Sequence, residues 1–146
     1  MAVDVVTEVV IDRAPELVAA YAVDPSNAPE WYVNIRAVEL ATPPPLRAGS
    51  KMAFVAHFLG RRLAYTYEVV ELVPGARLVM RTAEGPFPME TTYSFEPAGD
   101  GKTRMTLRNR GEPSGFSKLA APLMAAAMRR ANQKDLEKLK ALLESR

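Results

Sequence analysis

Three tyrosines are the side chains in this sequence best suited to act on a ligand. Tyr65 and Tyr67 are two residues apart, and Tyr93 falls at a matching position of a later segment, so all three share one face of a predicted sheet. Each ring supplies apolar area, and each hydroxyl needs a hydrogen-bond partner once it is buried. Two interpretations stay open: core tyrosines bonded to the backbone or to one another, or tyrosines that orient a ligand's carbonyl or phenol group.

The other inward-facing polar side chains are an amide and threonines. Asn109 is expected opposite Thr91, and a buried amide must be satisfied either by protein and water or by a ligand. Only Glu71, at a strand end, brings a carboxyl group to the inward face of the central strands. General acid–base catalysis normally uses His, a carboxyl of raised pKa or a Lys of lowered pKa. We therefore expect no catalytic residue, although an enzyme remains an alternative.

Metal and cofactor chemistry find little support in the sequence. The chain has no cysteine, which excludes disulfides, thiolate nucleophiles and thiolate metal sites. The only histidine, His57, falls on the outer face of its predicted strand. A zinc site needs several convergent ligands, and the glycines at 99–101 and 111–115 lie in turn-like segments rather than in a phosphate loop. We expect no metal and no cofactor.

Length and charge limit the class of protein. The chain has 146 residues and is 48% hydrophobic, which suits one domain over 1–146 with a real core. The net charge is only +2 and the basic residues are scattered, so we expect no nucleic-acid partner. The N-terminus does not look like a signal peptide, and no window approaches 18 apolar residues. We expect no transmembrane segment and a cytoplasmic location.

Hydrophobic periodicity predicts the elements that position these side chains. A Val-rich strand over 2–11 is followed by short helices over about 15–22 and 27–32, and by a weaker strand over 33–41. From Lys51 onward, strands alternate with turns near 60–61, 73–76, 84–87 and 98–102. A helix is expected from about 116 to 144, interrupted only by Pro122.

The predicted turns determine which residues of neighbouring strands lie opposite each other, and these pairs should share one face of the sheet. A two-residue turn at Gly60-Arg61 sets Phe58 opposite Leu63, Ala56 opposite Tyr65, Phe54 opposite Tyr67 and Met52 opposite Val69. The next turns set Val69 opposite Met80, Met80 near Thr91, Leu78 near Tyr93, Tyr93 opposite Leu107 and Phe95 opposite Met105. A slip of one residue would invert a strand. Because four turns keep one face apolar, we predict a strongly twisted antiparallel sheet of about seven strands.

The C-terminal helix is expected to cover that face. Its apolar stripe comprises Ala120, Leu123, Met124, Ala127, Met128, Ala131, Leu139 and Leu142. The first part of the stripe is built from Ala and Met, which either approach the sheet closely or leave a malleable void. The basic face around Arg129, Arg130 and Lys134 lies away from it.

The predicted cavity is lined by aromatic, sulfur-containing and amide side chains. Trp31 either plugs the core or walls the mouth of the cavity. An ordinary packed core has the same inventory, so an apolar cavity with a few polar groups is one of two interpretations. The lining residues that we predict are Trp31, Phe54, Phe58, Tyr65, Tyr67, Met80, Tyr93, Asn109, Leu123, Met124 and Met128.

Three stretches of the chain carry a resemblance to a known family. They are residues 11–16 (IDRAPE) with 24–31 (DPSNAPEW), residues 71–78 (ELVPGARL) and residues 135–144 (DLEKLKALLE). With the order of elements, they resemble the START-like or helix-grip superfamily (SRPBCC), in particular its polyketide cyclase/dehydrase and lipid-transport group. The resemblance covers nearly the whole chain and implies an α+β helix-grip fold (β-α-α-β6-α) around a long C-terminal helix.

The resemblance implies a fold more sharply than a function. Our first hypothesis is a carrier or binder of a small hydrophobic molecule such as a lipid, an isoprenoid or an aromatic polyketide. The second is an aromatase/cyclase or dehydratase that acts on a polyketide-like substrate. The third is a protein-interaction module that uses the basic helix face, and a homodimer is compatible with all three.

Overall fold

One antiparallel sheet of seven strands dominates the part of the chain that the structure describes, residues 3–85, 88–112 and 121–146 of a computed structural model. The strands are β1 (Val3–Ile11), β2 (Ile35–Leu40), β3 (Lys51–Phe58), β4 (Arg61–Val73), β5 (Arg77–Glu84), β6 (Met89–Pro97) and β7 (Thr103–Gly111). The helices are α1 (Pro15–Val23), the 3-10 turn η1 (Pro25–Asn27), α2 (Ala28–Trp31) and α3 (Ala121–Glu144).

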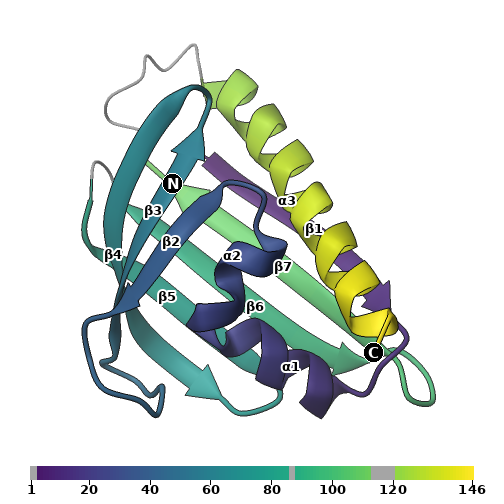
Figure 1. Cartoon of the computed structure of the whole chain (residues 1–146). Coiled ribbons are helices and arrows are strands. Elements are labelled where there is room, and N and C mark those ends of the chain that lie inside the picture. The colour runs from purple at the N-terminus through teal and green to yellow at the C-terminus, as the bar shows by residue number, and fades with distance from the viewer. Residues whose placement is uncertain (1–2, 86–87, 113–120) are drawn as a thin grey trace.

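The sheet curls strongly around the C-terminal helix (Figure 1). Its strand order is β1-β7-β6-β5-β4-β3-β2, so every neighbour except the β1–β7 pair is also a neighbour in sequence. Helix α3 runs along β1 on the open side of the curl, while α1 and α2 cover one end of it (Figure 1). The predicted helix-grip architecture is confirmed.

Local sequence signals explain the short helices. Pro15 opens α1, where its missing N–H costs no helical bond, and Glu16 follows in the first turn. The Asp24 side chain then accepts a 3.0 Å hydrogen bond from the Ser26 N–H and caps η1. Helix α2 has only four residues and is shorter than the helix predicted over 27–32. Residues 116–120 of the predicted C-terminal helix lie outside the described residues.

The hairpin between β3 and β4 turns one residue earlier than predicted. Its two central residues are Leu59 and Gly60, with φ angles of 51° and 74°, as a type I′ turn requires. Tyr65 therefore pairs with Phe54, and Tyr67 pairs with Met52, two residues from the predicted register. An even shift keeps every side chain on its predicted face. The later registers, such as Val69 with Met80, Leu78 with Tyr93 and Phe95 with Met105, are confirmed.

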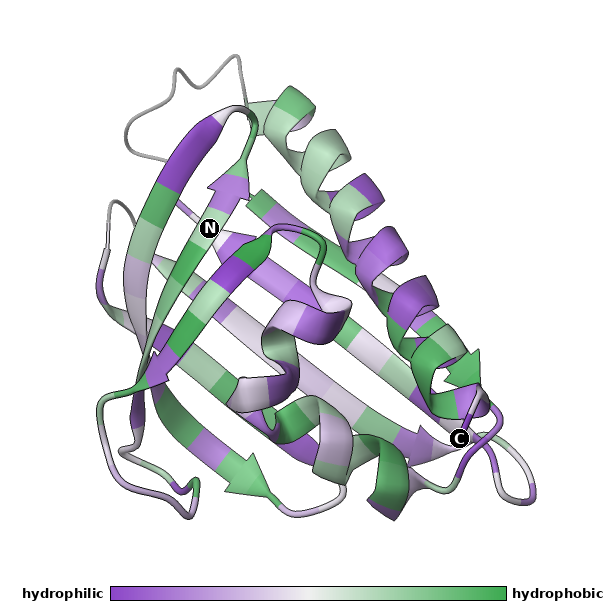
Figure 2. Cartoon of the chain, viewed as in Figure 1, coloured by the Kyte–Doolittle hydropathy of each residue, from purple (hydrophilic) through white to green (hydrophobic). Residues whose placement is uncertain are grey.

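The core lies where the C-terminal half of α3 meets the curled sheet. Leu136, Leu139 and Leu143 of this half are fully buried. The apolar colour of α3 is strongest at its two ends, and its middle turns are polar (Figure 2). The prediction that Leu123 belongs to the buried stripe is wrong, because 75% of this residue is exposed to solvent. The buried seam runs through Met124, Asn132 and Asp135 instead, roughly 100–180° around the helix from Leu123.

Candidate functional site

A cavity of about 110 Å³ lies between the inner face of the sheet and α3. All but two of the predicted lining residues contribute to its wall. The additional lining residues are Tyr32, Asn34, Ile35, Ala56, Leu63, Met89, Thr91, Ala131, Asn132 and Asp135. The two exceptions are Leu123, which is exposed, and Trp31, which lies in the core behind the wall.

Aromatic rings form the wall contributed by the sheet. The Phe54 and Tyr65 rings are stacked with their centroids 5.5 Å apart, and Tyr67 meets Tyr65 edge-on at 5.1 Å. Trp31 supports this wall from behind, with its ring centroid 4.2 Å from that of Tyr32 and 5.7 Å from that of Tyr93. Of the two roles considered for Trp31, it plugs the core.

Tyr67 and Asn109, two of the predicted polar residues, are linked by hydrogen bonds through the hydroxyl group of Thr91. The Thr91 hydroxyl donates to Oδ1 of Asn109 at 2.6 Å. Because a hydroxyl has one proton, Thr91 must accept the 2.7 Å hydrogen bond that joins it to the Tyr67 hydroxyl. Burial raises the pKa of Tyr67 to about 12. The Tyr67-Thr91-Asn109 chain therefore fits the interpretation of a bonded core network.

The remaining tyrosines differ in their hydrogen bonding. The Tyr32 and Tyr93 hydroxyls are 2.6 Å apart and bond to each other, and burial raises the pKa of both groups. The Tyr65 hydroxyl makes no hydrogen bond to any of the described residues, although burial also raises its pKa well above the ordinary value. Tyr65 is thus the tyrosine whose hydroxyl is free to meet a ligand.

A buried carboxyl group in the cavity wall was missed by sequence reasoning. Asp135 is only 2% exposed, and its Oδ1 accepts a 2.8 Å hydrogen bond from the Val33 N–H. Burial raises the pKa of Asp135 to about 7, against the lowering effect of the Val33 hydrogen bond and of Lys138. A pKa raised this far makes both protonation states of the carboxyl group accessible near neutral pH, which suits it to proton transfer.

One turn before it on α3, an amide also faces the cavity. Asn132 is 4% exposed and its Nδ2 has no hydrogen-bond partner among the described residues. Leaving a buried donor unpaired costs about 1–3 kcal/mol. The spacing of Met128, Asn132, Asp135 and Leu139 is a signal that could have revealed both residues, since it follows one helix face.

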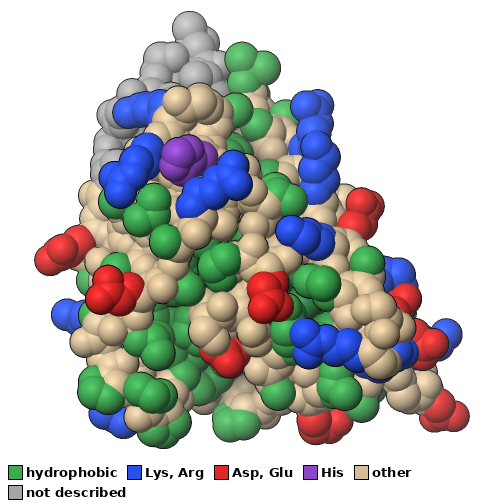
Figure 3. Space-filling view, viewed as in Figure 1, with side chains coloured by type: hydrophobic (Ala, Val, Ile, Leu, Met, Phe, Trp, Pro, Cys, Tyr) green, Lys and Arg blue, Asp and Glu red, His purple; other side chains and the backbone are tan. Residues whose placement is uncertain are grey.

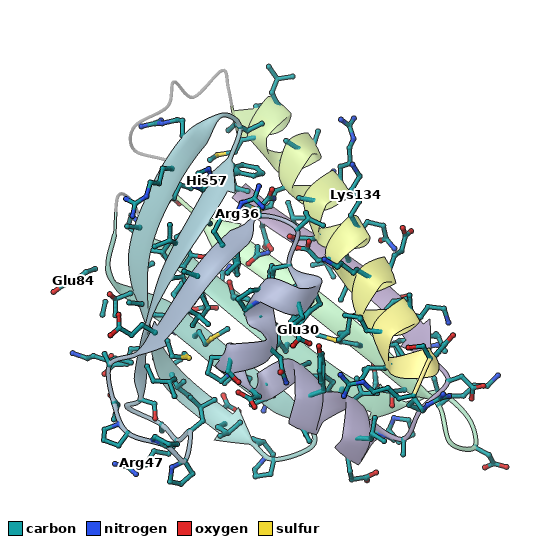
Figure 4. The ribbon with its side chains drawn as sticks, viewed as in Figure 1. Glu30, Arg36, Arg47, His57, Glu84 and Lys134 are labelled. Carbon is teal, nitrogen blue, oxygen red and sulfur yellow. The ribbon has the colours of Figure 1, made fainter. Side chains whose placement is uncertain are left out.

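His57 and Lys134 are ionisable residues outside the cavity, and both lie on the surface. His57 is exposed and pairs with Arg62 across the β3–β4 hairpin; it lies among basic side chains on the surface (Figure 3). Lys134 points from α3 to solvent (Figure 4). Among the described residues no group of three or more His, Cys, Asp or Glu side chains could hold a metal ion.

A second, larger pocket has a volume of about 620 Å³. It is bounded by α1, the 41–50 segment and the β4–β5 turn, with Ala19, Leu46 and Leu72 in its walls and the exposed Glu16 and Asp24 at its rim. None of the buried side-chain atoms without a partner among the described residues belongs to its walls. We therefore take the smaller inner cavity as the candidate site.

A comparison with protein families identifies the architecture. Residues 2–144 match the model of the family described as polyketide cyclase / dehydrase and lipid transport. The chain belongs to this family. No curated protein matches the sequence.

Several solved structures have a fold similar to that of this chain but share little sequence identity with it. TTHA0849 from Thermus thermophilus is 24% identical with a TM-score of 0.82, and 94% of each chain is covered. A START superfamily protein from Mycobacterium smegmatis is 14% identical with a TM-score of 0.81, over 97% of each chain. The Zhui aromatase/cyclase from Streptomyces sp. R1128 is 15% identical with a TM-score of 0.80, covering 97% of this chain and 93% of that one.

These relationships support a ligand-binding or cyclase-type protein of the START-like superfamily. In the part of the chain that the structure describes, no helix has both the length and the apolar character needed to cross a membrane.

Proposed function

We propose that this protein binds a small hydrophobic ligand in the cavity between the sheet and α3. One observation carries the proposal: a cavity lined mainly by apolar and aromatic side chains contains a buried donor, Asn132 Nδ2, that no described residue pairs. The Tyr65 hydroxyl in the same wall also has no hydrogen bond to a described residue. An ordinary core satisfies such groups internally. A ligand pocket holds a few of them ready to orient its guest.

The volume of the cavity limits what fits without a change of shape. An apolar cavity of about 150 Å³ holds a benzene molecule, so a cavity of about 110 Å³ takes a single ring, or one end of a longer molecule, only with a small outward shift of its walls. A larger ligand requires one wall to yield. Ligand sites for drug-sized molecules are typically about 300–1,000 Å³.

The wall that yields most easily is the N-terminal half of α3. The C-terminal half is tied down by hydrogen bonds from Arg13 to the carbonyls of Glu144 and Arg146, both at 2.7 Å, and from Lys140 to the Val10 carbonyl at 2.9 Å. The N-terminal half rests on a small apolar cluster built around Val3, Val5 and Met124. Methionine side chains are flexible, so displacement of this half would admit a longer ligand.

The test is to purify the protein from its native host, record native mass spectra and extract any bound molecule. A cavity-filling variant, Ala56→Leu, is expected to lose at least tenfold in affinity for the molecule recovered, because Ala56 is buried and faces the cavity. Ala64→Leu is the matched control, since Ala64 is exposed on β4. Thermal unfolding checks that the added methyl groups have not overpacked the core. Unchanged binding by a folded Ala56→Leu variant would place the ligand elsewhere.

A second candidate function, cyclisation of a polyketide-like chain, is favoured by Asp135. A carboxylate with a pKa of about 7 can take a proton from a methylene group between two carbonyls. The resulting enolate carbon would then add to a carbonyl of the same chain, and the proton would return to the new alkoxide. This candidate ranks second because a long poly-carbonyl chain does not fit the cavity without displacement of α3.

The cyclase candidate predicts that product formation from a short poly-β-ketone thioester falls at least 100-fold in Asp135→Asn and at least several-fold in Tyr65→Phe. Product analysis by mass spectrometry gives the readout, and Ala64→Leu again serves as the control. Equal product yield with the protein and with buffer alone would leave ligand binding as the function.

A further inference from the structure

Three polar groups of the cavity wall lie on two neighbouring turns of α3 and on strand β4. Asn132 and Asp135 are three residues apart and therefore lie on the same face of the helix. Both side chains and Tyr65 line the cavity. Among the described residues, no Lys or Arg contributes to its wall. Of the described residues in this wall, Asp135 is the one that carries a carboxyl group.

The hydrogen bonding of Asp135 leaves one oxygen for a guest. Oδ1 is occupied by the Val33 N–H at 2.8 Å, which fixes the orientation of the carboxyl group. No hydrogen bond from the described residues reaches Oδ2. The Asn132 Nδ2 nearby on the helix is an unpaired donor. The site therefore offers an acceptor and a donor, both from buried side chains.

These two groups discriminate between ligand chemistries. Above pH 7, where Asp135 is ionised, an anionic ligand would meet its carboxylate with no cation in the wall to neutralise it. An ammonium group can only donate, so it would leave the Asn132 donor unpaired. A hydrocarbon would satisfy neither group. A hydroxyl can donate to Asp135 and accept from Asn132 at the same time.

We propose that the ligand of this cavity carries a neutral hydroxyl group, as an apolar phenol or alcohol does, held between Asp135 and Asn132. This inference rests on the proposed binding function and specifies its ligand class. The Tyr65 ring and its stacked partner Phe54 would then cover the apolar part of the same molecule.

The test uses four small single-ring probes, phenol, toluene, benzoate and benzylamine, titrated into the protein by calorimetry at pH 7.5. We expect phenol to bind at least tenfold more tightly than toluene, although toluene is the more hydrophobic molecule. Benzoate is expected not to bind. Asp135→Asn and Asn132→Leu should each reduce phenol affinity at least tenfold and leave toluene affinity within about twofold.

Each other outcome has a definite meaning. Equal affinities for phenol and toluene, or equal losses of both in Asp135→Asn, would overturn the hydroxyl anchor and keep the cavity as a binding site. Tightest binding of benzylamine would overturn it in favour of a cationic ligand. Failure of all four probes, with wild-type protein folded, would overturn both the anchor and the proposed binding of small rings in this cavity.

Discussion

Replacement of Asp135 by Asn is expected to stabilise the protein by up to about 4 kcal/mol at pH 8. Burial raises the pKa of Asp135 to about 7, whereas its ordinary value is 3.8, and each unit of pKa difference corresponds to about 1.4 kcal/mol. The folded protein therefore holds this proton more tightly than the unfolded chain. Stability from Asp135 is fully present below pH 4, is lost as the pH rises to about 7, and stays lost above it.

The Asp135→Asn variant removes the negative charge of the carboxylate and keeps the hydrogen bond from the Val33 N–H. Its side-chain oxygen can still accept from the Val33 N–H, so the gain at pH 8 should disappear near pH 4. Glu137→Gln, which removes an exposed carboxyl from the same helix, is expected to change stability by less than about 0.5 kcal/mol. Urea unfolding of the three proteins at pH 4, 6 and 8 gives the measurement.

The quantity to compare is the difference in unfolding free energy between variant and wild type at each pH, because other groups also change the stability of both proteins. Hydrogen bonds from Arg108 and Lys140 lower the pKa of Asp4 and Glu144, so these carboxylates lose their stabilising effect as the pH falls. That trend has the opposite sign to the effect of Asp135. A variant no more stable than wild type at pH 8 would show that burial does not destabilise the charged carboxylate.

The sheet could be predicted because its faces are strongly specified. Alternating side chains make any register error of one residue turn apolar groups to solvent. The β3–β4 hairpin shows the limit of this reasoning, since its turn proved to be Leu59-Gly60 and the pairing moved by two residues. Tyr65 and Tyr67 kept their inward face because the error was even. The pattern therefore determines which side a residue faces more reliably than which residue it pairs with.

The helix was harder to predict because its buried seam contains polar residues. An apolar stripe drawn through α3 includes Leu123 and passes over Asn132 and Asp135. In the structure Leu123 is exposed and the two polar residues are buried. Hydrophobic periodicity assumes that buried positions are apolar, and that assumption fails where a site requires a hydrogen-bonding group. The departure from the pattern therefore coincides with the candidate site.

The hydrogen-bond network among the predicted polar residues also lay beyond the sequence. Asn109 and Tyr67 were candidates to contact a ligand, but Thr91 links them to each other. Tyr65 has the same residue type and lies two residues away, yet its hydroxyl has no partner among the described residues. Only the side-chain geometry distinguishes a satisfied tyrosine from one available to a ligand.

Trp31→Ala is expected to cost about 3–5 kcal/mol of unfolding free energy, a large part of the stability of a typical domain. Trp31 is fully buried and contacts the rings of Tyr32 and Tyr93, whose hydroxyls bond to each other at the cavity wall. Removal of the indole ring leaves a void behind both. Urea unfolding followed by far-ultraviolet circular dichroism is suitable, because the variant lacks the only tryptophan.

Leu123→Ala is the matched comparison, since both residues were predicted to line the same cavity. Leu123 is 75% exposed, so its truncation should cost less than about 0.5 kcal/mol. Trp31→Phe should be intermediate, because it keeps an aromatic ring and removes an Nε1 donor that has no partner among the described residues. Comparable losses in Leu123→Ala and Trp31→Ala would mean that α3 is rotated towards Leu123. Asn132 and Asp135 would then leave the cavity, and the hydroxyl anchor would fail with them.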